Sequence, residues 1–257
     1  KGVLMSDPVS RRRLITAGLA VGAGAAGLTI AARLASRYGL IPPDSGGVWG
    51  LGETLTYATQ RVLMSHHSLA REFNRSEISK VVPVSGEPPQ TEPFERLLAG
   101  GFADWRLTVD GMVARPSSFS LDELKRFPSR SQITHQACEE GWSFIAEWTG
   151  VQLATILNFV GVSSRAKFVA VFPFDESWDS LDLPDAFHPQ TFLAYGLNGQ
   201  DLPTRHGAPL RLRVARQLGY KSVKYLSRVT VTDSLKNIGK GLGSASPEAG
   251  YSWFAGI

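Results

Sequence analysis

Short strand-like segments constrain the fold of this chain most strongly, because they outnumber the helical segments and do not alternate regularly with them. Apolar or alternating runs predict strands in "WRLTVDGMV", "AKFVAVFPF", "TFLAYGLNGQDLP", "PLRLRVARQLGY" and "VKYLSRVTVTD". The pairs Asp110-Gly111 and Asn198-Gly199 are typical of hairpin turns, and "ITHQACEEGW" predicts a strand that leads into a loop. Strands without regular crossover helices predict the α+β class, with mixed β-sheets and peripheral helices.

Helical patterns are few. "SLDELKRF" begins with a capping box, in which Ser120 is the N-cap and Glu123 stands three residues later. "VQLATILNFVG" has the pattern of an amphipathic helix, and Gly161 is placed to end it. A third helix-like piece, "ETLTYATQRVLMSHHSLAREF", lies within residues 38–100, which are otherwise rich in Pro, Gly and Ser.

The basic residues are concentrated at the start of the chain. The 257 residues contain 27 Lys and Arg against 23 Asp and Glu, and residues 1–37 alone hold six of the basic residues and one acidic residue. The rest of the chain is therefore close to neutral. It does not show the basic stripe that binds phosphate backbones, so we expect no nucleic-acid partner.

Residues 1–37 have the layout of an export signal. Three arginines precede an uncharged stretch of 19 residues, from Leu14 to Ala32. The sequence "SRRRLI" resembles the twin-arginine motif, whose pathway exports proteins that are already folded, so we expect a periplasmic or extracytoplasmic location. The uncharged stretch is just long enough to span a bilayer. Both a cleaved signal and a retained membrane anchor are therefore open.

Cys138 is the only cysteine, so no internal disulfide can form. One interpretation is a buried thiol that packs as a small hydrophobic group, but the neighbours of Cys138 are polar. A thiol protease would need a partner histidine, and no pair of ligands has the spacing of a zinc site. A soft metal that binds one thiolate, with its other ligands supplied by a cofactor, remains possible on these residues. The polar neighbours are His135, Gln136, Glu139 and Glu140, and the other histidines are His66, His67, His188 and His206.

Two long blocks resemble a known family. "CEEGWSFIAEWTGVQLATIL" is similar to the segment C-x-E-G-W-S…W-T-G-V-x-L of the molybdopterin-dependent oxidoreductases of the sulfite oxidase fold. "HGAPLRLRVARQLGYKSVKYL" resembles a later signature of the same family, and the closing "GYSWFAGI" resembles its bacterial branch. The resemblance extends from about Leu63 to the C-terminus and implies a sulfite-oxidase-type molybdopterin-binding domain.

The resemblance implies a cofactor and its ligands. In this family the cysteine is the one protein ligand to molybdenum, and the dithiolene of a molybdopterin helps to complete the centre, so Cys138 takes the catalytic and metal-binding role. The motifs also imply pterin contacts in four segments. These are Ser68, Arg71 and Glu72 of "SLAREF", Pro173 at a strand end, His206 and Arg211 of "HGAPLR", and Ser222, Val223 and Lys224 of "YKSVK".

The chemistry of phosphate binding supports the last of these segments independently. A phosphate dianion binds Arg and Lys together with backbone N–H groups, which Arg211, Gly219, Ser222 and Lys224 can supply. The alternation in "LRLRV" leaves open a solvated strand face that carries Arg211 and Arg213. We expect Trp142 and Trp148 to lie in the core, and Glu139, Glu140 and Glu147 to be surface carboxylates.

The resemblance implies three parts of the chain. Residues 1–37 would be a twin-arginine export signal or N-terminal membrane anchor, and residues 38–100 an irregular segment that contributes to the cofactor site. Residues 101–257 would be the molybdopterin-binding oxidoreductase domain, forming a single globular unit with residues 38–100.

The implied activity is oxygen-atom transfer. No arginine stands beside Cys138, and an anionic substrate such as sulfite would need a cationic pocket, so we expect a neutral substrate. The chain is similar to the periplasmic branch that includes protein-methionine-sulfoxide reductase catalytic subunits, although His206 replaces an asparagine of that branch. This implies reduction of an S- or N-oxide, such as a methionine sulfoxide, with electrons from a membrane haem or quinone-linked protein. A sulfite-oxidising dehydrogenase and a non-catalytic membrane-anchored module that retains the fold are the alternatives.

Overall fold

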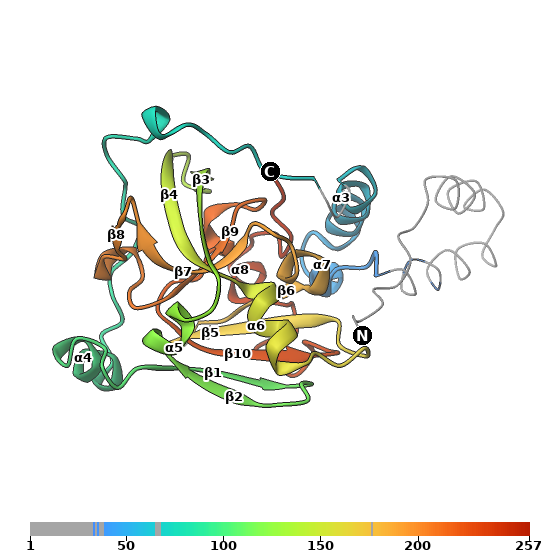
Figure 1. The fold of residues 1–257 in the computed structure, drawn as a ribbon. Helices are drawn as coiled ribbons and strands as arrows, with labels where there is room; N and C mark the ends of the chain where they lie inside the picture. Colours follow the sequence, from blue (N-terminus) through green and yellow to red (C-terminus); the bar gives the residue numbers. More distant parts are fainter. Residues whose placement is uncertain (1–32, 34, 36–38, 65–67, 176) are drawn as a thin grey trace, which may run out of the picture.

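The structure, a computed structural model, describes residues 33, 35, 39–64, 68–175 and 177–257. Two sheets of five strands form the centre of this part of the chain (Figure 1). The first sheet has the order β2-β1-β10-β5-β6, and it is mixed because β1 and β10 are parallel while its other pairs are antiparallel. Its strands are β1 (Arg106–Gly111), β2 (Ser117–Ser120), β5 (Phe168–Pro173), β6 (Asp179–Asp182) and β10 (Leu226–Thr232).

The second sheet is antiparallel. Its order is β3-β4-β7-β8, and β9 pairs with the other part of β7. Its strands are β3 (Ser129–Ala137), β4 (Ser143–Gln152), β7 (Thr191–Leu197), β8 (Gln200–Asp201) and β9 (Arg211–Val214). One mixed and one antiparallel sheet, together with helices that do not alternate regularly with the strands, confirm the predicted α+β class.

The main core lies between the two sheets. Val169 and Val229 of the first sheet are buried in the same cluster as Val151 and Leu193 of the second. Helix α6 adds its buried face to this cluster. The helices are α3 (Gly50–Leu63), α4 (Glu92–Ala99), α5 (Leu121–Lys125), α6 (Leu153–Val160), α7 (Leu183–Ala186) and α8 (Ala245–Glu248), and the 3-10 turns are η2 (Pro43–Gly46), η3 (Arg75–Glu77), η4 (Thr204–His206) and η5 (Gly219–Lys221).

Local sequence signals mark several element ends correctly. The capping box is confirmed, because the Ser120 hydroxyl accepts from the Glu123 N–H at 3.2 Å while the Glu123 carboxylate accepts from the Ser120 N–H at 2.7 Å. Gly161 ends α6 in the left-handed conformation, with φ of 75°. The helix begins at Leu153, because the two residues before it extend β4, a strand that the sequence analysis did not predict.

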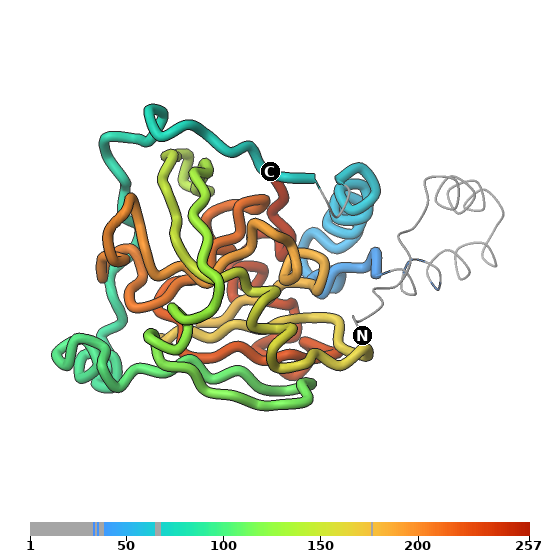
Figure 2. Tube along the Cα trace, in the orientation of Figure 1, coloured from blue at the N-terminus to red at the C-terminus, as the bar shows by residue number. Residues whose placement is uncertain are grey.

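The predicted helix around residues 53–73 is too long. Helix α3 ends at Leu63, and residues 68–91 pass the second sheet toward α4 without a helix other than the 3-10 turn η3 (Figure 2). The backbone N–H of Phe73 donates to Ile133 of β3, and that of Ser79 donates to Ile145 of β4, each at 2.9 Å. These hydrogen bonds to strand backbones compete with helix formation in this segment.

Part of the chain lies outside the described residues. This part includes the predicted leader, residues 1–37 with the exception of Arg33 and Ala35, and also His66 and His67. Among the residues that the structure does describe, no helix has both the length and the apolar character needed to cross a bilayer.

Candidate functional site

One end of the second sheet borders a cavity of about 320 Å³. Cys138 reaches it from the end of β3, Arg211 from β9, and Pro173 from the end of β5. The loop that joins β9 to β10 lines the cavity with Gly219, Tyr220, Ser222, Val223, Lys224 and Tyr225. The fold therefore brings together residues that are more than 70 positions apart in the chain, and six of the predicted site residues are among them.

Cys138 stands at a tight turn after β3. Its N–H donates to the carbonyl of Trp142 at 2.8 Å, and its carbonyl accepts from the N–H of Gly141 at 3.1 Å. Its side chain is half-buried, and the sulfur lies 3.3 Å from Glu139 Oε2 and 3.8 Å from Glu140 Oε2. The interpretation of this thiol as a core hydrophobic group is therefore wrong.

Burial, together with these two carboxylates, raises the pKa of the Cys138 thiol to about 11. At neutral pH the free side chain is a protonated thiol, which is a poor nucleophile. A bound metal ion removes this proton, because a coordinating thiol is deprotonated outright. The surroundings of Cys138 therefore do not favour a free thiolate nucleophile.

Two cations, Arg211 and Lys224, line the same cavity as Cys138 and concentrate positive charge there. Arg211 is 3% exposed, and it donates to the backbone carbonyls of His206 at 2.8 Å and Ser222 at 2.9 Å. Burial lowers the pKa of Arg211 to about 10. Burial, together with Arg211 and Arg205, lowers the pKa of Lys224 to about 8. Buried cations with lowered pKa values form a site that an anion would stabilise.

Four buried polar atoms of residues that line this cavity lack a protein hydrogen-bond partner among the described residues. They are Arg211 Nε, Gln136 Oε1, Trp178 Nε1 and the Tyr225 hydroxyl. A ligand that carries both acceptors and donors would satisfy them, since buried polar groups are normally paired. The pterin phosphate supplies acceptors, and the pterin ring supplies donors. The residues present therefore fit the cofactor that the sequence implies.

Gly219 lets η5 pack closely against the end of β3. A Cβ placed on Gly219 would lie 3.1 Å from the Ala137 carbonyl oxygen and 3.3 Å from Gln136 Nε2. Any larger side chain would crowd the contact between the end of β3 and η5. Glycine at this position therefore keeps Tyr220 and its neighbours close to the strand end that precedes Cys138.

Four predicted site residues do not line this cavity. The imidazole of His206 is half-buried behind it, and burial and the charge of Arg211 lower its pKa to about 4, so it is neutral at pH 7. The other three lie along the extended segment after α3. Ser68 accepts at its carbonyl from His188 and Arg216, Arg71 is exposed near Glu77, and Glu72 pairs with Arg130.

Some expectations about neighbouring residues need correction. Glu147 is not a surface carboxylate, because it is 6% exposed and pairs with Arg75 at 2.6 Å. Arg211 and Arg213 do not form a solvated face, because all four residues of β9 are buried. Trp148 is buried as predicted, whereas Trp142 lines the cavity. Three further residues line the cavity although no sequence motif marked them as site residues, namely Gln136, Tyr220 and Tyr225.

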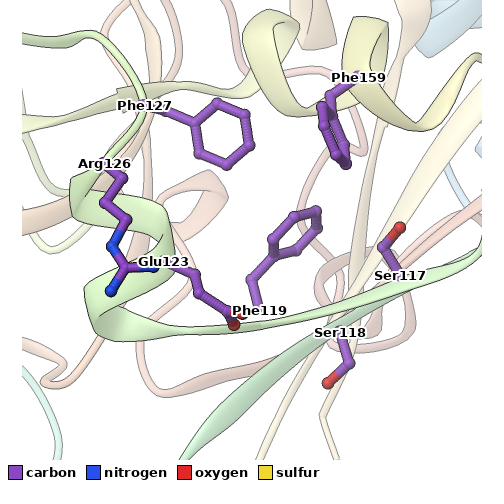
Figure 3. Close-up of a pocket in the computed structure, with 7 residues that line it drawn as sticks. All are labelled: Ser117, Ser118, Phe119, Glu123, Arg126, Phe127 and Phe159. Carbon is purple, nitrogen blue, oxygen red and sulfur yellow. The ribbon is translucent and has the colours of Figure 1, made fainter.

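A second cavity of about 460 Å³ lies between β2, α5 and α6. Figure 3 shows the rings of Phe119, Phe127 and Phe159 turned toward one another around it, and their centroids lie 5.3 to 5.9 Å apart. None of the unpaired buried polar atoms found among the described residues lines this cavity. The cavity at Cys138 is therefore the candidate functional site.

Comparison with known proteins identifies the family of this chain. The model of the "Oxidoreductase molybdopterin binding domain" family matches residues 97–237. A protein of Azospira oryzae named "Putative protein-methionine-sulfoxide reductase subunit YedZ1" is 36% identical over 186 residues, which are 69% of this chain and 69% of that protein.

The protein-methionine-sulfoxide reductase catalytic subunit MsrP of Xanthomonas campestris pv. campestris is 34% identical over 162 residues, which are 57% of this chain and 50% of MsrP. This match therefore spans half the length of that relative. Among solved structures, the sulfane dehydrogenase SoxCD from Paracoccus pantotrophus aligns with a TM-score of 0.48 and 26% identity over 51% of this chain and 39% of that one. The family match covers more than half of the chain, and the chain accordingly belongs to the oxidoreductase molybdopterin binding domain family.

Proposed function

We propose that this chain is the molybdenum-bearing catalytic unit of an enzyme that reduces an S- or N-oxide. The observation that carries the proposal is the cavity in which the only thiol, Cys138, faces the cations Arg211 and Lys224. The printed names of two relatives, which are protein-methionine-sulfoxide reductase subunits, support a sulfoxide as the substrate.

Each group in the cavity has a task in this proposal. Cys138 would hold molybdenum as a thiolate, and metal binding would release the proton that the free thiol keeps at neutral pH. Arg211 and Lys224 would bind the pterin phosphate through charge-assisted hydrogen bonds. When bound, the molybdenum–molybdopterin supplies the oxygen-atom transfer, and the protein supplies its ligand, its orientation and the access path.

The charges closest to Cys138 favour a neutral substrate. Glu139 and Glu140 place carboxylate oxygens within 3.8 Å of the sulfur. Two negative charges at this distance repel sulfite, which is a dianion, and do not repel an uncharged sulfoxide. The cations of the cavity are assigned to the pterin phosphate, so they do not compensate for this repulsion. Reduction of a neutral oxide is therefore the favoured direction.

We also propose that the protein is exported and receives its electrons from a membrane haem or quinone-linked protein. The support is the sequence of residues 1–37, in which Arg11, Arg12 and Arg13 precede an uncharged stretch. Replacing all three arginines by lysine should leave the protein in the cytoplasmic fraction. Continued appearance outside the cytoplasm would contradict this route.

The decisive experiment measures molybdenum content together with sulfoxide and sulfite turnover. The full chain, expressed with its cofactor pathway, should contain molybdenum and should reduce methionine sulfoxide with a viologen donor. Cys138→Ala should lose both properties, whereas Ser129→Ala, at the exposed start of the same strand, should keep them. A chain without molybdenum would favour the non-catalytic module, and sulfite-dependent cytochrome reduction without sulfoxide reduction would reverse the assigned direction.

A further inference from the structure

Helix α3 carries its apolar residues on the outside. Leu51 is 76% exposed and Leu55 is 60% exposed, and the residues just before the helix, Val48 and Trp49, are 88% and 60% exposed. Leu51 and Leu55 are four residues apart, so they lie on one face of the helix. Together with Tyr251, which is 47% exposed, these residues are called the α3 face.

The opposite side of α3 is fixed to the core through Tyr57 and Arg61. The Tyr57 hydroxyl donates to Asp182 at 2.7 Å, and Arg61 binds Asp182 at 2.5 Å and Asp185 at 2.8 Å. Both carboxylates are buried, so rotating the helix to cover its leucines would leave charges unpaired in the core. The outward position of Leu51 and Leu55 is therefore built into the fold. Figure 1 shows α3 on the side of the molecule away from α4.

The rim of the α3 face has the composition of a membrane interface. The Trp49 indole N–H donates to the Gly250 carbonyl at 3.2 Å, which holds the ring beside Tyr251. Lys236 and Lys240 are exposed on a loop that reaches this region, since a Cβ on Gly47 would lie 3.9 Å from Leu242. An apolar centre with Trp and Tyr at its edge and lysines nearby is typical of protein surfaces that bind anionic bilayers.

We infer that the α3 face lies on the surface of a lipid bilayer. The uncharged stretch that ends at Ala32 is long enough to span a membrane, and it ends 16 residues before Val48. Retained as an anchor, this stretch would keep the α3 face next to the bilayer. Basic residues at the rim match anionic headgroups. Of the acidic residues nearby, Asp44 is buried, Glu53 accepts from Ser252, and Glu248 accepts from the backbone N–H of Lys240 at 2.6 Å.

This placement brings the catalytic cavity close to the membrane. Tyr220 lines the cavity, and its ring centroid lies 5.7 Å from that of Tyr251 on the α3 face. One aromatic contact therefore separates the membrane-facing surface from the cavity. A donor embedded in the bilayer would meet the protein on the side where the cofactor is bound.

The test uses the full chain in vesicles of equal parts phosphatidylcholine and phosphatidylglycerol, with bromine on the acyl chains as a quencher of tryptophan fluorescence. Trp49→Phe should lose most of the quenching that the wild type shows. Leu51→Glu combined with Leu55→Glu should lose most of it too. The matched control is Val81→Glu combined with Leu98→Glu, which changes two exposed apolar residues away from α3 and should retain the wild-type quenching. This readout does not depend on molybdenum or on turnover.

Three results would overturn the inference. One is equal quenching in the wild type and in Trp49→Phe. A second is blue-shifted Trp49 emission without vesicles, which would show that residues of this chain already cover the face. A third is self-association in the absence of lipid that Leu51→Glu combined with Leu55→Glu abolishes, which would assign the face to a second copy. Thermal unfolding of each variant checks that these exposed substitutions leave the fold intact.

Discussion

The guanidinium carbon of Arg211 lies 4.9 Å from the ring centroid of Trp148, and that of Arg213 lies 5.5 Å from the same ring. Cation–π contacts and backbone carbonyls thus hold the two buried arginines. Arg213 donates to His135 at 2.7 Å and to Val214 at 2.9 Å, which ties β3 to β9. Arg211 keeps an unpaired Nε at the cavity, so its charge remains available for a ligand.

Replacing Arg211 should weaken cofactor binding. Arg211→Gln removes a charge-assisted hydrogen bond of about 1.5 to 3 kcal/mol, which corresponds to roughly a tenfold to hundredfold loss of affinity. Molybdenum and pterin released from the purified protein measure the effect. Arg205→Gln, which changes an exposed arginine paired with Glu87, is the control and should keep the wild-type content. Equal pterin content in both variants would contradict the phosphate-binding role of Arg211.

Lys224 predicts a pH dependence of anion binding. Its pKa in the cofactor-free site is lowered to about 8, so the side chain is charged below that pH and becomes neutral above it. Sulfate, which keeps its charge over this range, should bind the cofactor-free chain more weakly as the pH rises through 8. Because a bound anion raises the pKa of a neighbouring lysine, binding near pH 8 should take up protons. Calorimetry in buffers of different ionisation enthalpy detects this uptake, and Lys224→Met should abolish it.

The parts of the structure that could be predicted are those with a local cause. Ser120 and Glu123 determine a helix start within four residues, and Gly161 determines a helix end. Strand β4 was missed because its stability comes from pairing with β3 and β7, which no local pattern encodes. The burial of Glu147 depends likewise on Arg75, which is 72 positions away.

The same distinction between local sequence signals and tertiary contacts applies to the residues of the candidate site. Cys138, Arg211 and Lys224 stand in motifs that resemble a family, whereas Gln136 does not. The period of two in β3 could have indicated it, since Gln132, Thr134 and Gln136 alternate with less buried residues and face one side of the strand. Tyr220 lies in a 3-10 turn without such a pattern, so its position at the cavity depends on tertiary structure alone.

Neutralising Glu139 and Glu140 should make the free Cys138 thiol more reactive. Burial is the main cause of its raised pKa of about 11, and both carboxylates raise it further. Glu139→Gln combined with Glu140→Gln should lower this pKa, and each unit of decrease increases the thiolate fraction about tenfold at a pH well below the pKa. The rate of alkylation by iodoacetamide against pH, measured on metal-free protein, gives the pKa directly. Glu248→Gln serves as the control, and an unchanged thiol pKa in the double variant would show that the carboxylates have no influence.

Asp185 should be the most sensitive carboxylate for stability. It binds Arg61 at 2.8 Å and Arg216 at 2.9 Å, and these two cations hold its pKa below its usual value in spite of burial. Asp185→Asn removes a buried negative charge that two cations share, and it should cost about 3 to 5 kcal/mol of unfolding free energy at pH 7. Because the folded-state pKa is lowered, this stabilisation is present above the unfolded value of 3.8 and is lost as the pH falls through the folded value. Urea unfolding should therefore show a large difference between wild type and variant at pH 7 and a smaller one in acid. Glu92→Gln, in an exposed pair with Arg96, should change the unfolding free energy by only about 0.5 kcal/mol, and a similarly small effect of Asp185→Asn would contradict the role of the buried network.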